Sequence, residues 1–195
     1  MSRPRRIVVG VSGASGAIYG VRALEALRPM PGLETHAIIS KGAAATIAYE
    51  TGRDPQEVAA LADVSYEETQ LAASIASGTF LTDGMLVAPC SIRTLAAVAG
   101  SLNDNLLVRA ADVHLKERRR LVLMVRETPL HLGHLRLMSD VTAAGAVVLP
   151  PVPGFYTLPQ TVADIVDHSV GKAFDVLGIE HDLFERWSGP PPREP

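Results

Sequence analysis

The chain has 195 residues, 47% of them hydrophobic and 20% charged, which suits one α/β domain with a sizeable core and excludes a disordered chain. A net charge of −3 and 5% aromatic residues provide neither the basic surface nor the stacking platforms that nucleic-acid binding needs. No apolar run is long enough to span a bilayer, and a single cysteine, Cys90, excludes an internal disulfide, so we expect a cytoplasmic protein that contacts no membrane.

The hydrophobic pattern predicts strands that alternate with helices along the whole chain. Short β-branched runs are typical of buried parallel strands, and apolar residues near the 3.6-residue period indicate helices. The expected strands are residues 5–11, 33–40, 84–90, 121–125 and 146–149, and the expected helices are residues 16–27, 42–50, 55–63, 94–99, 105–117, 129–143 and 162–177. This alternation predicts an open, mostly parallel sheet with helices on both faces. One domain is expected over residues 1–187, with a flexible, proline-rich tail over 188–195.

A glycine-rich turn, residues 10–16 (GVSGASG), connects the first expected strand to the first helix. Small residues at this place let the backbone approach a phosphate, and Ser12 and Ser15 add hydroxyl donors. The spacing matches neither a dinucleotide fingerprint nor a P-loop. The second strand ends in Ser40 and Lys41, with no acidic residue to bind a ribose, which argues against NAD. A tight turn without a ligand is an equally good interpretation of the glycines alone.

A second polar turn, residues 88–94 (APCSIRT), follows the third expected strand. Ser91 and Thr94 could donate to an anion or to the edge of a flavin, and Arg93 could neutralise an anion. The turn alone is also consistent with a simple helix cap. Cys90 ends the strand, and we expect it to be a buried small residue rather than a nucleophile.

Two cations share one face of the helix expected over residues 105–117. Arg109, Asp112 and Lys116 are spaced i, i+3 and i+7. The pattern is typical of a solvated salt-bridge ladder, and it equally fits half of a phosphate clamp.

In the segment 125–134 (VRETPLHLGH), Arg126 and Glu127 directly follow a buried strand, at the edge of the sheet where ligands bind. Arg126 suits bidentate phosphate recognition, and an ion pair with Glu127 is the alternative. Glu127 could exchange protons with a substrate. His131 and His134 have the spacing of two metal ligands, but no third ligand follows, so we expect no metal.

The proline-rich residues 150–156 (PPVPGFY) predict a stiff loop that holds Tyr156, whose hydroxyl could bind a phosphate or simply pack under the loop. Lys172 on the last helix is by default a surface lysine. Trp187 precedes the tail, and such a residue is usually docked on a neighbouring surface.

Together, five segments resemble the UbiX-type flavin prenyltransferase family, and the resemblance covers about residues 7–187. The segments are residues 9–20 (VGVSGASGAIYG), 88–95 (APCSIRTL), 109–119 (RAADVHLKERR), 125–135 (VRETPLHLGHL) and 150–156 (PPVPGFY).

The resemblance implies a Rossmann-like three-layer αβα sandwich that binds FMN, assembled as a dodecamer with active sites at subunit junctions. It implies transfer of a dimethylallyl group from dimethylallyl monophosphate to N5 and C6 of reduced FMN, without a metal. The product, prenylated FMN, would serve UbiD-type decarboxylases.

The resemblance also implies roles for individual residues. The FMN contacts are Gly13, Ala14, Ser15, Ser40, Ser91, Ile92, Arg93, Thr94 and Arg126. The prenyl-phosphate site is Arg109, Lys116, Arg126, Tyr156 and Lys172, with Arg109 able to come from a neighbouring subunit. Ser15, Glu50 and Glu127 lie beside the reacting flavin, and Trp187 closes over the site. Leu71 stands where some members carry a tryptophan in the wall of the prenyl pocket.

Three other functions fit parts of the pattern. A flavin-dependent cysteine decarboxylase shares the fold, but its signature turn differs from residues 89–94 (PCSIRT). Direct decarboxylation of an aromatic acid lacks a dedicated general acid. A non-catalytic flavin carrier would need only one phosphate site.

Overall fold

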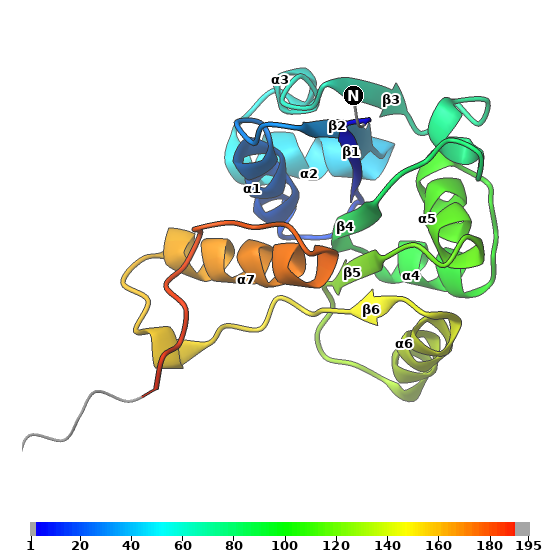
Figure 1. The fold of residues 1–195 in the computed structure, drawn as a ribbon. Helices are drawn as coiled ribbons and strands as arrows, with labels where there is room; N and C mark the ends of the chain where they lie inside the picture. The colour runs from blue at the N-terminus through cyan, green and yellow to red at the C-terminus, as the bar shows by residue number, and fades with distance from the viewer. Residues whose placement is uncertain (1–2, 190–195) are drawn as a thin grey trace, which may run out of the picture.

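The computed structural model describes residues 3–189, which fold into a six-stranded sheet between two layers of helices (Figure 1). The strands lie in the order β3-β2-β1-β4-β5-β6, and all neighbours are parallel. They are β1 (Arg5–Val11), β2 (Leu33–Ile39), β3 (Val64–Glu67), β4 (Gly84–Cys90), β5 (Leu121–Val125) and β6 (Val147–Val148). The helices are α1 (Ala17–Leu27), α2 (Lys41–Thr51), α3 (Pro55–Ala59), α4 (Ile92–Ala99), α5 (Leu106–Lys116), α6 (Leu132–Ala144) and α7 (Val162–Leu177), with 3-10 turns η1 (Ser74–Ala76) and η2 (Phe155–Thr157). The predicted three-layer αβα sandwich is confirmed.

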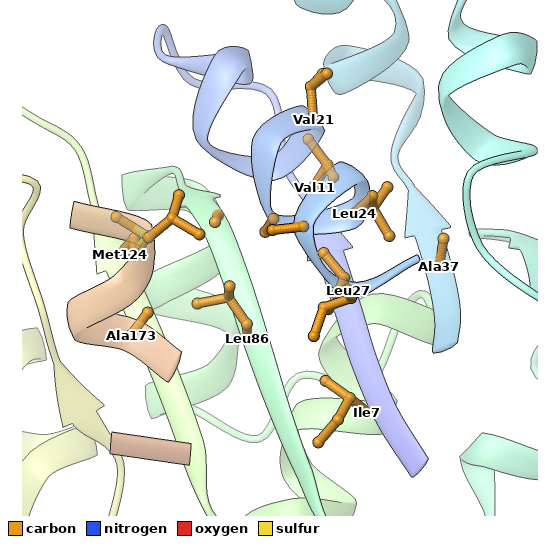
Figure 2. Packing of buried hydrophobic residues seen from close by; sticks show 14 of the residues in the cluster. Ile7, Val11, Val21, Leu24, Leu27, Ala37, Leu86, Met124 and Ala173 are labelled. Carbon is orange, nitrogen blue, oxygen red and sulfur yellow. The ribbon is translucent and has the colours of Figure 1, made fainter. Parts of the chain in front are cut away.

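Each face of the sheet carries its own hydrophobic core, because successive side chains of a strand point to opposite faces. The core on one face packs α1, α2, α3 and α7 against the sheet. Figure 2 shows Leu24 and Leu27 of α1 beside β1, and Ala173 of α7 near Met124. The core on the other face packs α4, α5 and α6 against the alternate strand positions, such as Val8.

Helix α1 approaches the sheet closely at Gly20. A Cβ atom there would lie 2.3 Å from the carbonyl oxygen of Ala88 and 2.8 Å from a Val11 methyl group. The missing side chain therefore lets α1 lie directly over the junction of β1 and β4, the two strands whose ends carry the polar turns.

Several predicted elements differ from the structure. Strand β3 was not predicted, because it is only four residues long, lies at the edge of the sheet and alternates between half-buried and exposed side chains. Helix α3 ends at Ala59 rather than residue 63, and α6 begins at Leu132 rather than residue 129. The later start of α6 follows from its cap, since the ring of His131 accepts a backbone N–H of the first turn at 3.0 Å. Of the expected tail, residues 190–195 lie outside the described residues.

Candidate functional site

The strand order places a topological switch point between β1 and β4. From β1 the chain moves outward to β2 and β3, then returns to β4 on the other side of β1. Helix α1 follows β1 on one face of the sheet, and α4 follows β4 on the other. In such sheets ligands bind in the crevice beyond the carboxyl ends of the two strands. The glycine-rich turn and the turn at Ser91 lie at this crevice.

A cavity of about 650 Å³ opens here. Its lining includes five of the expected FMN contacts, namely Gly13, Ser40, Ser91, Arg93 and Thr94. Three other expected contacts, Ala14, Ser15 and Ile92, are chain neighbours of this lining. The volume suits a ligand the size of a nucleotide.

Three helices begin at this cavity, and this convergence makes it an anion site. Ser40, Ser91 and Asn105 cap α2, α4 and α5, and each cap side chain accepts a backbone N–H of its helix at 3.0–3.2 Å. All three caps line the cavity. The remaining free N–H groups and the positive ends of the helix dipoles favour a phosphate.

Charged side chains supplement the helix ends. Lys41 and Arg93 line the cavity, and within residues 3–189 no carboxylate lies at ion-pair distance from either cation. Glu68 and Asp104 line it too, and Glu68 accepts the backbone N–H of Lys41 at 3.1 Å. The second strand does end without an acidic residue, as the argument against NAD states, but Glu68, directly after the unpredicted strand β3, brings a carboxylate to the backbone of Lys41.

Sequence reasoning also missed Asn105 and Glu68 as parts of this cavity. The backbone N–H of Leu106 donates to the carbonyl of Glu68 at 2.7 Å, and this contact joins the start of α5 to the segment after β3. Asn105 carries a sequence signal, an Asn directly before a helical pattern. Glu68 carries none, since only the pairing of β2 with β3 brings it to the cavity.

The hydroxyl of Ser12 is not available to a ligand, contrary to the expectation from the glycine-rich turn. Ser12 is only 1% exposed, donates to the carbonyl of Pro89 at 2.8 Å and accepts the N–H of Ser91 at 2.8 Å. Ser12 is therefore part of the framework that joins the two turns.

A second group of polar residues meets beside the first turn of α1. The carboxylate of Glu50, at the end of α2, accepts the N–H groups of Gly16 and Ala17 at 2.8 and 3.0 Å. Partial burial raises the pKa of Glu50, but hydrogen bonds from Ser15 and these two N–H groups, with the charge of Arg126, outweigh it and lower the pKa overall. The structure thus places Ser15 and Arg126 near an ionised Glu50, whereas no contact joins Glu127, the third residue expected beside the flavin, to this group within residues 3–189.

Arg126 follows β5 and extends its pairing with β4, because its N–H donates to the carbonyl of Cys90 at 3.0 Å. The alternative ion pair between Arg126 and Glu127 is absent from residues 3–189. Glu127 is exposed, and its carboxylate accepts the neighbouring N–H of Thr128 at 3.0 Å. Both side chains therefore lie where a ligand could contact them.

The C-terminal residues form a separate aromatic cluster. The hydroxyl of Tyr156 lies 3.2 Å from a ring nitrogen of His168, and the ring of Trp187 meets Tyr156 edge-on at 5.8 Å. These residues line a cavity of about 380 Å³. Lys172 lies one turn after His168 on α7 and pairs with Asp175 at 3.2 Å. Tyr156 and Trp187 thus lie together, and Lys172 is on the neighbouring turn of α7 but does not line this cavity.

Arg109 and Lys116 do not join that cluster within one chain. Arg109 pairs with Asp112 at 3.3 Å and donates to the carbonyl of Ala76 at 3.1 Å, whereas Lys116 pairs with Glu117. Lys116 is eleven residues beyond the cap of α5, roughly 16 Å along the helix from the cavity. Within the protomer these residues match the salt-bridge ladder.

Other reactive groups contribute no chemistry in the described chain. Burial raises the pKa of the Cys90 thiol to about 12, so the thiol stays protonated. The rings of His131 and His134 lie 3.6 Å apart, and no three or more His, Cys, Asp or Glu side chains in residues 3–189 are placed to share a metal ion. None of the described helices is both long and apolar enough to cross a membrane.

Known proteins resemble this chain over nearly its whole length. The flavoprotein family model matches residues 1–174. The flavin prenyltransferase UbiX of Thauera aromatica is 58% identical over 189 residues, which cover 97% of each chain. A UbiX crystal structure in complex with FMN and dimethylallyl pyrophosphate superposes with a TM-score of 0.93 at 51% identity, covering 96% of this chain and 99% of the other. A dodecameric, FMN-dependent UbiX-like decarboxylase from Escherichia coli O157:H7 superposes with a TM-score of 0.92 at 49% identity, covering 94% and 100%.

Proposed function

The chain belongs to the UbiX-type flavin prenyltransferase family, and on that premise we propose that it transfers a dimethylallyl group from dimethylallyl monophosphate to N5 and C6 of reduced FMN. The observation that carries the proposal is the cavity at the switch point, where three helix N-termini meet Lys41 and Arg93, two cations with no carboxylate at ion-pair distance in the described part of the chain. The Ser15, Glu50 and Arg126 group lies beside the same turn. An anion site next to a polar reaction site fits a flavin phosphate and its ring.

The residues of the cavity fit FMN. The phosphate would lie at the starts of α2 and α4, close to Ser40, Thr94 and Arg93, because these groups supply donors and positive charge. The ring would extend past residues 13–15 toward Arg126, where glycine and alanine leave space for a flat aromatic system. The bound reduced flavin supplies the two nucleophilic ring positions.

The leaving phosphate requires a second set of cations. Lys172 and the hydroxyl of Tyr156 fit this role, and Trp187 would cover them from solvent. Lys116 lies too far along α5 to serve the cavity of its own protomer, and the guanidinium of Arg109 is held by Asp112 and the carbonyl of Ala76. We propose that they serve the site of a neighbouring subunit in a dodecamer like that of the Escherichia coli relative.

The chemistry needs stabilisation of one leaving group and removal of one proton. The allylic C–O bond breaks, and the electron pair leaves with the phosphate, whose negative charge the cations and Tyr156 stabilise. The flavin ring shields the allyl cation from water. The cation would bond to N5, which loses its proton, and protonation of the remaining alkene would let its other end bond to C6, which then loses its proton. The carboxylate of Glu127 or the released phosphate would accept the net proton released.

The direct test is anaerobic incubation of the protein with reduced FMN and dimethylallyl monophosphate, followed by mass spectrometry of the flavin. We expect a gain of one C5 unit that is lost in Lys116→Ala and Arg126→Ala and kept in Arg28→Ala, which removes an exposed cation at the end of α1. Dimethylallyl pyrophosphate, bound by the relative, is supplied in parallel to define the donor.

Unmodified, tightly bound FMN with either donor would contradict prenyl transfer and favour the cysteine decarboxylase or the flavin carrier. Glu127→Gln tests the proton acceptor separately. We expect slower product formation in this variant, and an unchanged rate would leave the released phosphate as the acceptor.

The fate of the product completes the proposal. Prenylated FMN leaves this site as the cofactor of a UbiD-type decarboxylase, and the transfer would occur in the cytoplasm. Adding the prenylated product to an inactive UbiD-type apoenzyme, and measuring the recovery of decarboxylation, tests this step.

A further inference from the structure

A buried serine connects the two turns of the switch point. Pro89, near the end of β4, has no N–H and cannot donate to β1, and the last paired residues of these two strands are Gly10 and Val87. Ser12 joins the two strand ends beyond this pair. Its N–H donates to the carbonyl of Pro89 at 3.2 Å and its hydroxyl donates to the same oxygen at 2.8 Å. The hydroxyl oxygen also accepts the N–H of Ser91 at 2.8 Å.

Hydrogen bonds lead from Ser91 to Thr94 at the cavity. The hydroxyl of Ser91 accepts the N–H of Thr94 at 3.2 Å and donates its own proton to the hydroxyl oxygen of Thr94 at 3.0 Å. Each hydroxyl carries one proton, so those of Ser12 and Ser91 are both in use. The proton of the Thr94 hydroxyl has no acceptor in residues 3–189, and Thr94 lines the cavity.

We propose that Ser12 is a positioning residue for the flavin phosphate: through Ser91 it orients the hydroxyl of Thr94 as a hydrogen-bond donor into the cavity. The proposal rests on the placement of FMN in this cavity. Ser12 itself contacts no ligand, since it is 1% exposed and its hydroxyl is fully used. Its removal leaves the N–H of Ser91 without an acceptor and frees Ser91 and Thr94 to rotate.

The test is a double-mutant cycle with Ser12→Ala, Thr94→Val and both changes together, each measured for the Kd of FMN and of riboflavin by flavin fluorescence. We expect each single change to weaken FMN binding about ten-fold, with the double variant no weaker than the worse single variant. Riboflavin, which lacks the phosphate, should bind all variants equally. If Ser12→Ala does not fold, Ser12→Cys keeps the volume with a weaker hydrogen-bonding group and should show a smaller loss of the same kind.

Thr82→Val is the matched control. Thr82 is also a buried hydroxyl, 6% exposed, and bonds His114 and Arg119 at 2.9 and 3.1 Å, outside the cavity lining. It should lower the Tm while leaving the Kd of FMN unchanged.

Three results would decide against the idea. An unchanged Kd in Ser12→Ala, with weaker binding in Thr94→Val, overturns the role of Ser12 and keeps the FMN site. An unchanged Kd in Thr94→Val overturns the placement of the phosphate itself. Equal weakening of FMN and riboflavin would show that Ser12 only stabilises the fold.

Discussion

Replacing Gly20 by Ala should separate α1 from the sheet. The new Cβ would lie 2.3 Å from the carbonyl oxygen of Ala88 and 2.8 Å from Val11, and a backbone carbonyl cannot rotate away as a side chain does. Alanine stabilises a helix by about 1 kcal/mol relative to glycine. Overpacking costs about 1–3 kcal/mol, and a backbone clash belongs at the upper end. The free energy of unfolding should therefore fall by about 2 kcal/mol, the difference of these two effects.

The assay is thermal and urea unfolding of the variant. For a domain of this size a loss of about 2 kcal/mol lowers the Tm by roughly 4–8 °C. Gly100→Ala is the matched control, because Gly100 has a φ of −90° and its nearest neighbour is the flexible, exposed Leu102 side chain at 3.3 Å. If Gly20→Ala unfolds at the same temperature as this control, the close packing of α1 on β4 is wrong.

Three further predictions concern groups outside the cavity. Burial lowers the pKa of His114 to about 4, below its unfolded value of 6.5. The unfolded state therefore binds more protons than the folded state between these two pH values. The free energy of unfolding should decline by up to about 3 kcal/mol as the pH falls through this window. Urea unfolding against pH checks this, and His114→Gln should flatten the slope. Asp175→Asn should loosen the C-terminal segment because it removes the ion pairs with Lys172 and Arg186 and weakens the contact with the ring of His181. Acrylamide should then quench the single tryptophan, Trp187, more strongly, and equal quenching would contradict this. Cys90, with its pKa of about 12, should react with a thiol reagent only after unfolding, so rapid labelling of the native protein would refute its burial.

The sequence predicted the parts of the fold that depend on local pattern. Strand β1 and helix α7 match their predicted bounds, since a continuous β-branched run and a capped 3.6-residue period leave little choice. Strand β3 was not predicted, because its side chains alternate between half-buried and exposed over only four residues and form no hydrophobic run.

The candidate site was predictable where it follows strand ends. Ser91 and Gly13 of the glycine-rich turn follow strand ends and line the cavity, whereas Arg126 follows the end of β5 and is not part of that lining. Glu68 was not expected, because its position depends on which strands pair. The roles of Arg109 and Lys116 remain predictions, because within the protomer they pair with Asp112 and Glu117 and not with residues of the cavity.

The three helix starts at the cavity have a consequence for how this protein can change over time. Their N–H groups belong to the main chain, so a replacement by any residue except proline keeps them and no change of pH neutralises them. The proposed prenyl-donor site would depend instead on long side chains such as Lys172, which one mutation removes. Binding of the flavin phosphate should therefore change slowly as this sequence evolves, whereas the preference for one prenyl donor could change after few mutations.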